Sequence, residues 1–560
     1  MHRVNRAADI GPLPVVASMA LLITALPVSD AAVLRGDDLL PDTLTPTAAI
    51  DRYIGETLAA RGVTAAPAAD PYTLARRLTL DLAGRIPTLD EVERFVDDLR
   101  SGRPTRCADE LIASHWYNHH AAAELNTLLR GVGGTGPDLS DYTFAAVAEN
   151  RPWDQMFREL LGAVPAADRP ERFVLGRLRD HDLLTRDVSS IYFGINISCA
   201  QCHTHPYQDT LTQDYFFGMK SFFARSYEFE GRLLERRFSR TLKYTPVGEE
   251  DRQAAVMFLT GDRVAPPPPD VPDLSKAIEE EQRRIDALRK KYVAAKRKDP
   301  QAVPEIPPDA DYPLRAQMAA IALSGANRPL FARAMVNRMW YRFFGYGLVM
   351  RVDQMHSDNR GSHPELLAWL ARDFIAHGFD LRRLTSGIVA SRAYRRTTRW
   401  VGPAPPAELF AVARLRPLTP SQMGISLLFV GRGAPPLGEI PPEPLPGRIR
   451  ELARKAGETF AGVFDQPYNG MQFNVSEALA VSNDPQQLGA IGADLVSQLM
   501  GLQEPRRQIE KAVLSVLGRP AEIEEVSWME DYLADREDRR GGLRQIIWAL
   551  CASSEFRFNH

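Results

Sequence analysis

Cysteine is scarce in this chain, with four residues among 560. Exported domains that depend on disulfides are dense in cysteine, so the sequence excludes a disulfide-rich scaffold. Cys107 and Cys551 are isolated, and they are either two buried thiols or one long-range pair. Cys199 and Cys202 lie three positions apart, and His203 follows directly. This pair is therefore the feature that needs a chemical explanation.

Excess charge and long apolar runs are also missing. The formal net charge is −3 and the isoelectric point is near 6.5, so nothing favours nucleic-acid binding. Beyond the N-terminus no segment approaches ~18 uninterrupted apolar residues, so we expect no stable membrane span after removal of a leader. There is no Gly-x-Ser-x-Gly elbow, no His-Glu-x-x-His and no Walker loop. The sequence leaves catalytic residues, enzyme status and oligomeric state undetermined.

The N-terminus has the pattern of an export signal. Arg3 and Arg6 precede an apolar run over residues 15–28, and Ser29 and Ala31 are small residues at the −3 and −1 positions of a cleavage site. We predict a signal peptide over residues 1–31 and a periplasmic or extracellular protein. An uncleaved N-terminal anchor is the alternative.

Helical patterns dominate the rest of the chain. Thr45 and Pro46 mark one helix start, Thr88 and Glu91 form a capping box, and Ser362 is expected to cap a helix that opens near Pro364. The pattern predicts a mainly α fold with two helical domains, residues 46–230 and 311–560. A connector over residues 231–310 holds short strands, a Pro-rich linker and a charged helix at 274–299.

The cysteine–histidine cluster has three interpretations. In Cys-x-x-Cys-His, the thiols of Cys199 and Cys202 bind the vinyl groups of haem c and His203 ligates the iron. Alternatively, thiolates and the imidazoles of His203 and His205 hold zinc or another divalent metal, with a further ligand from elsewhere. In the third interpretation, a disulfide or two buried thiols fix the turn over residues 196–206.

A second ligand to a haem iron must come from a distance, because Pro206 stiffens the backbone next to His205. We favour His363, which is expected to start a helix beside Gly361 and Ser362. Ligand sites are common between domains, so we also expect the loop over residues 199–206 to face the region 311–560.

Several long stretches resemble known families. "RRLTLDLAGRIPTLDEVERFVDDL", "NRPWDQMFRELL" and "FGINISCAQCHTHPYQDTLTQDYFFGMKSFFAR" are similar to the planctomycete cytochrome-C-like domain, domain-of-unknown-function family 1549. "NRPLFARAMVNRMWYRFFGYGLV", "SHPELLAWLARDFIAHGFDLRRLTSGIVASRAYRRTT" and "IIWALCASSEFRFNH" resemble its companion, family 1553.

This resemblance implies an exported protein without an established reaction. Cys199, Cys202, His203, His205 and Pro206 match the family's Cys-x-x-Cys-His-x-His-Pro pattern, whereas Thr204 and Leu211 depart from it. The leading hypothesis is a c-type-cytochrome-like protein that exchanges electrons with a periplasmic partner. One alternative is a non-haem metal protein that acts on extracellular polymers. Another is a structural protein in which the cysteine–histidine cluster only fixes the conformation of a loop.

Overall fold

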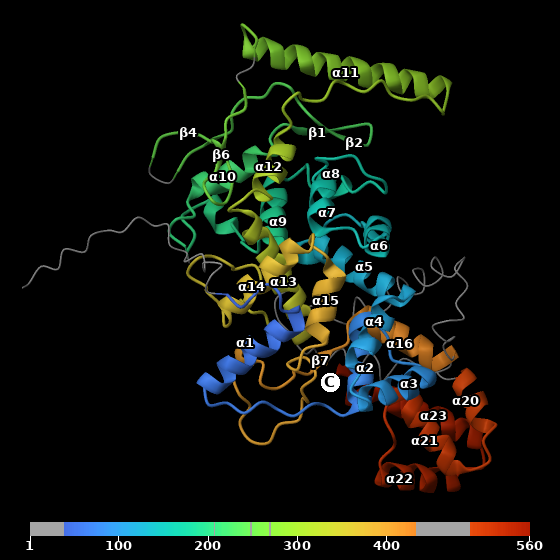
Figure 1. Ribbon diagram of the computed structural model, residues 1–560. Coiled ribbons are helices and arrows are strands. Elements are labelled where there is room, and N and C mark those ends of the chain that lie inside the picture. Colours follow the sequence, from blue (N-terminus) through green and yellow to red (C-terminus); the bar gives the residue numbers. More distant parts are fainter. Residues whose placement is uncertain (1–38, 207, 247–248, 268–269, 433–492) are drawn as a thin grey trace, which may run out of the picture.

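The computed structural model describes residues 39–206, 208–246, 249–267, 270–432 and 493–560 (Figure 1). Most of the described chain is helical, and each sheet within these ranges has only two strands. The mainly α fold class is confirmed. The predicted signal peptide, residues 1–31, lies outside the described residues. In the described ranges no helix has the length and apolar character needed to cross a membrane.

The N-terminal region is a series of helices whose starts carry the predicted caps. The Thr45 side chain accepts a hydrogen bond from the Ala48 amide, and Pro46 opens α1. Thr88 and Glu91 form the reciprocal capping box at α3. The elements are α1 Pro46–Ala60, α2 Pro71–Ala83, α3 Leu89–Arg100, α4 Pro104–Ile112, α5 His115–Leu129, η2 Val132–Gly134, α6 Ser140–Ala148, α7 Trp153–Leu160, α8 Arg172–Leu175, α9 His181–Phe193, η3 Ser198–Gln201 and α10 Gln213–Ser221.

The connector consists of short antiparallel strand pairs and one long helix. The pairs are β1–β2 (Ser226–Phe229, Arg232–Glu235), β3–β4 (Lys243–Tyr244, Arg252–Gln253) and β5–β6 (Val256–Met257, Arg263–Val264). Helix α11, Leu274–Lys298, confirms the predicted charged helix. It buries Ile285 against Phe229 and Leu234 of the first pair, and the rest of the helix stays in contact with solvent at the edge of the molecule (Figure 1).

Helices resume after the connector and continue to the C-terminus. These elements are α12 Leu314–Ala322, α13 Arg328–Phe344, α14 Pro364–Ala376, α15 Leu381–Val389, η4 Ala407–Leu409, β7 Arg416–Pro417, α16 Pro420–Arg432, α20 Ala493–Met500, α21 Pro505–Leu517, α22 Ile523–Ala534, α23 Arg539–Ala552, α24 Ser554–Arg557 and β8 Phe558–Asn559. The closing strand β8 pairs with β7, so the end of the chain returns to the body of the protein.

One hydrophobic core is shared between the N-terminal and C-terminal regions. Phe331 of α13 stacks with Trp153 and Tyr192, and all three side chains are fully buried. A second core gathers α16, α20, α21 and α23, and it includes Leu80 of α2. The two regions are therefore held together by continuous apolar packing, which contributes about 25 cal/mol per Å² of apolar surface removed from water.

Buried polar groups of α2 reinforce this contact. The Asp81 carboxylate pairs with Arg416 at 2.6 Å and accepts hydrogen bonds from the Tyr394 hydroxyl and the Asn559 amide at 2.7 and 2.8 Å. On the preceding turn, the Arg77 guanidinium donates to backbone carbonyls of the C-terminal region, among them that of Tyr394 at 2.5 Å. Asp81 is only 4% exposed, so its charge is balanced by these partners rather than by water.

We predict that Asp81→Ala lowers the free energy of unfolding by about 3–5 kcal/mol, because it leaves the charge of Arg416, whose side chain is 11% exposed, without its partner. Glu56→Ala is the control, since Glu56 forms an exposed pair with Arg52 and should change stability by less than about 1 kcal/mol. Urea denaturation followed by circular dichroism measures both. Equal midpoints for the two variants would contradict the assigned role of Asp81.

Candidate functional site

The cysteine–histidine loop starts where α9 ends. Gly194 closes α9 with φ 66°, and a Cβ at this position would lie 2.7 Å from the Met355 sulfur, so the close approach requires glycine. The Met355 amide donates to the Gly194 carbonyl at 2.9 Å, and the Asn196 amide donates to the Asp353 carbonyl at 2.8 Å. Ile195 and Gln354 form an antiparallel bridge. The expectation that this loop faces the region 311–560 is confirmed.

Both thiols of the motif are accessible. Cys199 lies in the 3-10 turn η3 and Cys202 caps it, with the Cys202 and His203 amides each donating to the Cys199 carbonyl at 3.2 Å. The two cysteines are exposed and are free thiols. Side chains three positions apart on a 3-10 turn nearly eclipse one another. Cys202 directly follows the turn, so the two thiols are close together along the chain.

The imidazole of His203 is exposed and oriented by its own backbone. Its Nδ1 lies 2.7 Å from the Thr204 carbonyl oxygen. Because a carbonyl only accepts, Nδ1 carries the proton in this contact and Nε2 keeps its lone pair. Ligating histidines are commonly oriented in this way, by a hydrogen bond from the second ring nitrogen.

His205 turns inward instead. It is 2% exposed, its amide donates to the Leu211 carbonyl at 2.9 Å, and its ring lies 5.8 Å from the ring of His356. Burial lowers the pKa of His205, and the neighbouring His356 lowers it further. Burial also lowers the pKa of His356. Both imidazoles are therefore neutral near pH 7, the form in which histidine binds a metal.

His363, our predicted distant ligand, is the N-cap residue of α14, and the prediction that Ser362 caps this helix is wrong. The Ser362 hydroxyl lies 3.2 Å from the Leu348 carbonyl and 3.0 Å from His363 Nδ1. His363 is 3% exposed and packs against Phe410 with ring centroids 5.5 Å apart. Burial lowers its pKa to about 4. The histidine that contacts His205 is His356, from the turn-rich loop that precedes His363 along the chain.

The sequence suggested His203, His205 and His363 as candidate ligands to a metal or to a haem iron. Among the described residues, no group of three histidine, cysteine, aspartate or glutamate side chains is arranged to hold a metal ion. The haem interpretation needs two reachable thiols and one imidazole, and Cys199, Cys202 and His203 are all exposed.

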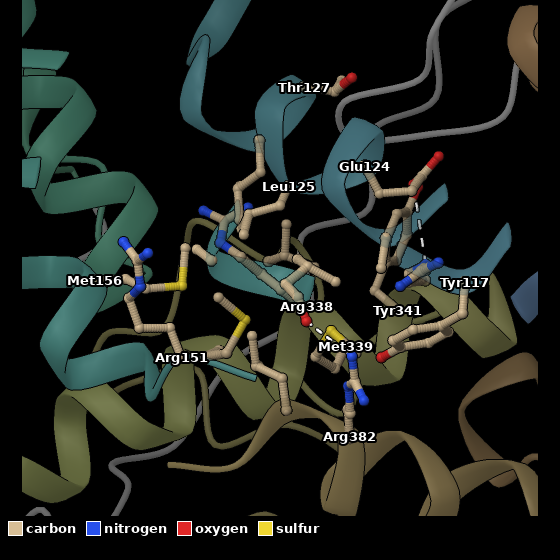
Figure 2. Close-up of a pocket in the computed structure, with 18 of the residues that line it drawn as sticks. Tyr117, Glu124, Leu125, Thr127, Arg151, Met156, Arg338, Met339, Tyr341 and Arg382 are labelled. Carbon is tan, nitrogen blue, oxygen red and sulfur yellow. Dashed lines mark hydrogen bonds and ion pairs between the residues drawn. The ribbon is translucent and has the colours of Figure 1, made fainter. Parts of the chain in front are cut away.

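A second feature was missed by the sequence reasoning. A cavity of about 430 Å³ lies between α5 and α6 of the N-terminal region and α13 and α15 of the C-terminal region (Figure 2). Val352 lines it, and the carbonyl of Val352 approaches Gly194 at the start of the loop. Leucine, methionine and arginine side chains form its walls. Nothing in the local sequence marks this cavity, because its lining comes from helices about 200 residues apart.

The fold and the loop define a class: a mainly helical protein with a Cys-x-x-Cys-His-x-His-Pro loop docked where two regions meet. Residues 49–228 match the family PSCyt2, a protein of unknown function (DUF1549), and residues 314–436 match PSD1, a protein of unknown function (DUF1553). Both family models thus match within this one chain. No curated protein and no solved structure matches it.

The four thiols should differ sharply in reactivity. Burial raises the pKa of Cys107 and of Cys551 to about 12, whereas Cys199 and Cys202 are exposed. In native protein made without haem-maturation machinery, we expect iodoacetamide to alkylate Cys199 and Cys202, and Cys107 and Cys551 only after denaturation. Peptide mass spectrometry gives the sites. Similar labelling of all four, or a Cys199–Cys202 disulfide in unreduced protein, would contradict this description of the loop.

Proposed function

We propose that this chain is an exported c-type-cytochrome-like protein that binds haem covalently through Cys199 and Cys202, with His203 as an axial ligand. The observation that carries the proposal is the contact between His203 Nδ1 and the Thr204 carbonyl, which leaves Nε2 to bind the iron in a loop whose two thiols are exposed. The abbreviation Cyt in the name of the matching family agrees with a cytochrome-like role.

Each residue of the loop has a defined task in this proposal. The thiols of Cys199 and Cys202 would hold the porphyrin through thioether bonds to its two vinyl groups. The Thr204 carbonyl accepts a hydrogen bond from His203 Nδ1, which supports Nε2 as the ligating nitrogen. Bound haem supplies reversible one-electron chemistry.

The position of the loop suits electron exchange with another protein. Cys199, Cys202 and His203 are exposed, so a periplasmic redox partner can approach this face without rearrangement of the core. The backbone bridge between Ile195 and Gln354 fixes the loop on the C-terminal region. Electron transfer, or haem-assisted redox chemistry, is the task that we propose. His363 remains the predicted sixth ligand of the iron. His356 is a second candidate for that position, because its ring contacts the ring of His205.

A second candidate is a non-haem site for zinc or another divalent metal. The observation that favours it is the pair of neutral imidazoles of His205 and His356, whose ring centroids are 5.8 Å apart. A metal held there needs further ligands, for which the thiolates of Cys199 and Cys202 have the right chemistry. In this case His205, rather than His203, is the essential histidine of the loop.

Expression in a host with export and haem-maturation machinery tests the proposal. We expect an intense Soret band, the mass of one covalent porphyrin, and haem staining after denaturing electrophoresis. Cys199→Ala/Cys202→Ala should lose all covalently bound haem, because no vinyl thioether can form. The control Cys551→Ala removes a buried thiol from the second core and should keep the haem.

Histidine variants separate the two candidates. His203→Ala should keep the covalent porphyrin but change the Soret position, since the iron loses its axial nitrogen, whereas His205→Ala should leave the attachment intact. A colourless wild-type protein that carries one equivalent of zinc, lost in His205→Ala and kept in His203→Ala, would overturn the haem proposal and support the metal site.

A further inference from the structure

The cavity between the two regions has walls that suit an apolar molecule. Leu125 and Leu128 of α5, Met156 of α7, and Met335 and Met339 of α13 line it. Its volume of about 430 Å³ is in the range of small-molecule sites. Figure 2 shows Leu125 and Met339 at the cavity, with Arg151 and Met156 on one side and Tyr117 and Arg382 on the other.

Two of the arginines in the lining already have carboxylate partners. Arg151 pairs with Glu149 and Glu159 at 2.6 and 3.0 Å. Arg342 lies 4.0 Å from Glu124, the only acidic residue among the described residues that line the cavity. The charges of both arginines are therefore balanced by carboxylates of the protein, so neither arginine needs an anionic ligand.

Arg382 is different, because within the described residues no carboxylate pairs with it. Its Nη2 donates to the Asn118 side chain at 2.9 Å and to the carbonyls of Val147 and Ala148 at 2.9 and 3.4 Å. Its Nε–H is buried without a hydrogen-bond acceptor. Its guanidinium lies over the Tyr117 ring at 5.7 Å from the centroid, an aromatic contact that orients it without neutralising it.

A buried donor without an acceptor costs free energy, and a cation without a counter-ion costs more. Arg382 is partly buried, and a ligand that brings an anionic oxygen to its guanidinium balances this charge. A carboxylate suits a guanidinium best in geometry. A small inorganic anion would leave the leucine and methionine walls in contact with water, so the anion must carry an apolar body.

We propose that this cavity binds an organic carboxylate with an apolar body, whose head group lies at Arg382 and whose body lies against Leu125, Leu128, Met156 and Met335. The buried Arg338 adds positive charge to the same cavity. The proposal does not depend on the occupant of the cysteine–histidine loop, since the cavity and Arg382 are present without it. The site lies where the two regions meet, so its ligand bridges them.

Octanoate is the probe, with octanol as the analogue that lacks charge and acetate as the anion that lacks an apolar body. Isothermal titration calorimetry on the full-length protein measures binding. We expect octanoate to bind at least about ten-fold more tightly than octanol or acetate, because only octanoate satisfies both parts of the site. Octanoate that binds no better than octanol, or shows no binding, would overturn the proposal.

Variants of the lining locate the site. Arg382→Met should weaken octanoate binding about ten-fold or more and leave octanol binding within about two-fold. The control Arg52→Met makes the same substitution on the exposed face of α1 and should change neither. Arg382→Lys keeps the charge but loses the Nε–H, so we expect an intermediate affinity for octanoate.

If Arg382→Met does not fold, a variant that fills part of the cavity still tests where octanoate binds. Leu128→Trp narrows the cavity with Arg382 intact, and it should weaken octanoate and octanol together. Thermal melting establishes that each variant is folded. If Arg382 serves only to hold the end of α6, then Arg382→Met lowers the melting temperature while the affinity for octanoate stays unchanged, and the proposal is wrong.

Discussion

The buried carboxylate of Asp81 is the contact on which the arrangement of the two regions depends. It ties α2 to Arg416 of β7, to Asn559 of β8 and to Tyr394 beyond α15. With the shared aromatic core, these bonds hold the N-terminal and C-terminal helices in one fixed relation. Both the cysteine–histidine loop and the arginine-lined cavity lie where these regions meet. The contact of the loop with His356 and the cavity each need residues from both regions.

Local signals predicted much of the fold because helix ends are decided by neighbouring residues. The caps at Thr45 and at Thr88 with Glu91 are short-range bonds, and the structure contains both. The charged helix α11 could also be predicted from local sequence, since its exposure to solvent follows from its own composition. The cap expected at Ser362 failed because a distant carbonyl, that of Leu348, lies within reach of its hydroxyl. A tertiary contact of this kind leaves no trace in the local pattern.

The candidate site was predictable in its covalent spacing but not in its surroundings. Cys199, Cys202 and His203 are close together in sequence, so the motif alone identified them as candidate ligands. The contact between His205 and His356 joins residues about 150 positions apart. It depends on the tertiary bridge between Ile195 and Gln354, which the sequence does not reveal. The cavity at Arg382 is a more extreme case, because α5, α6, α13 and α15 all contribute to it. Long-range packing, rather than any single motif, creates it.

The central claim is that His203, rather than the His205–His356 pair, is the ligating histidine of the loop. Anomalous X-ray scattering at the iron edge, on crystals of exported and haem-matured protein, tests it most directly. The account predicts one iron peak within bonding distance of His203 Nε2, with density continuous to the sulfurs of Cys199 and Cys202. An absence of iron at the loop, or a zinc-edge peak between His205 and His356, would contradict it.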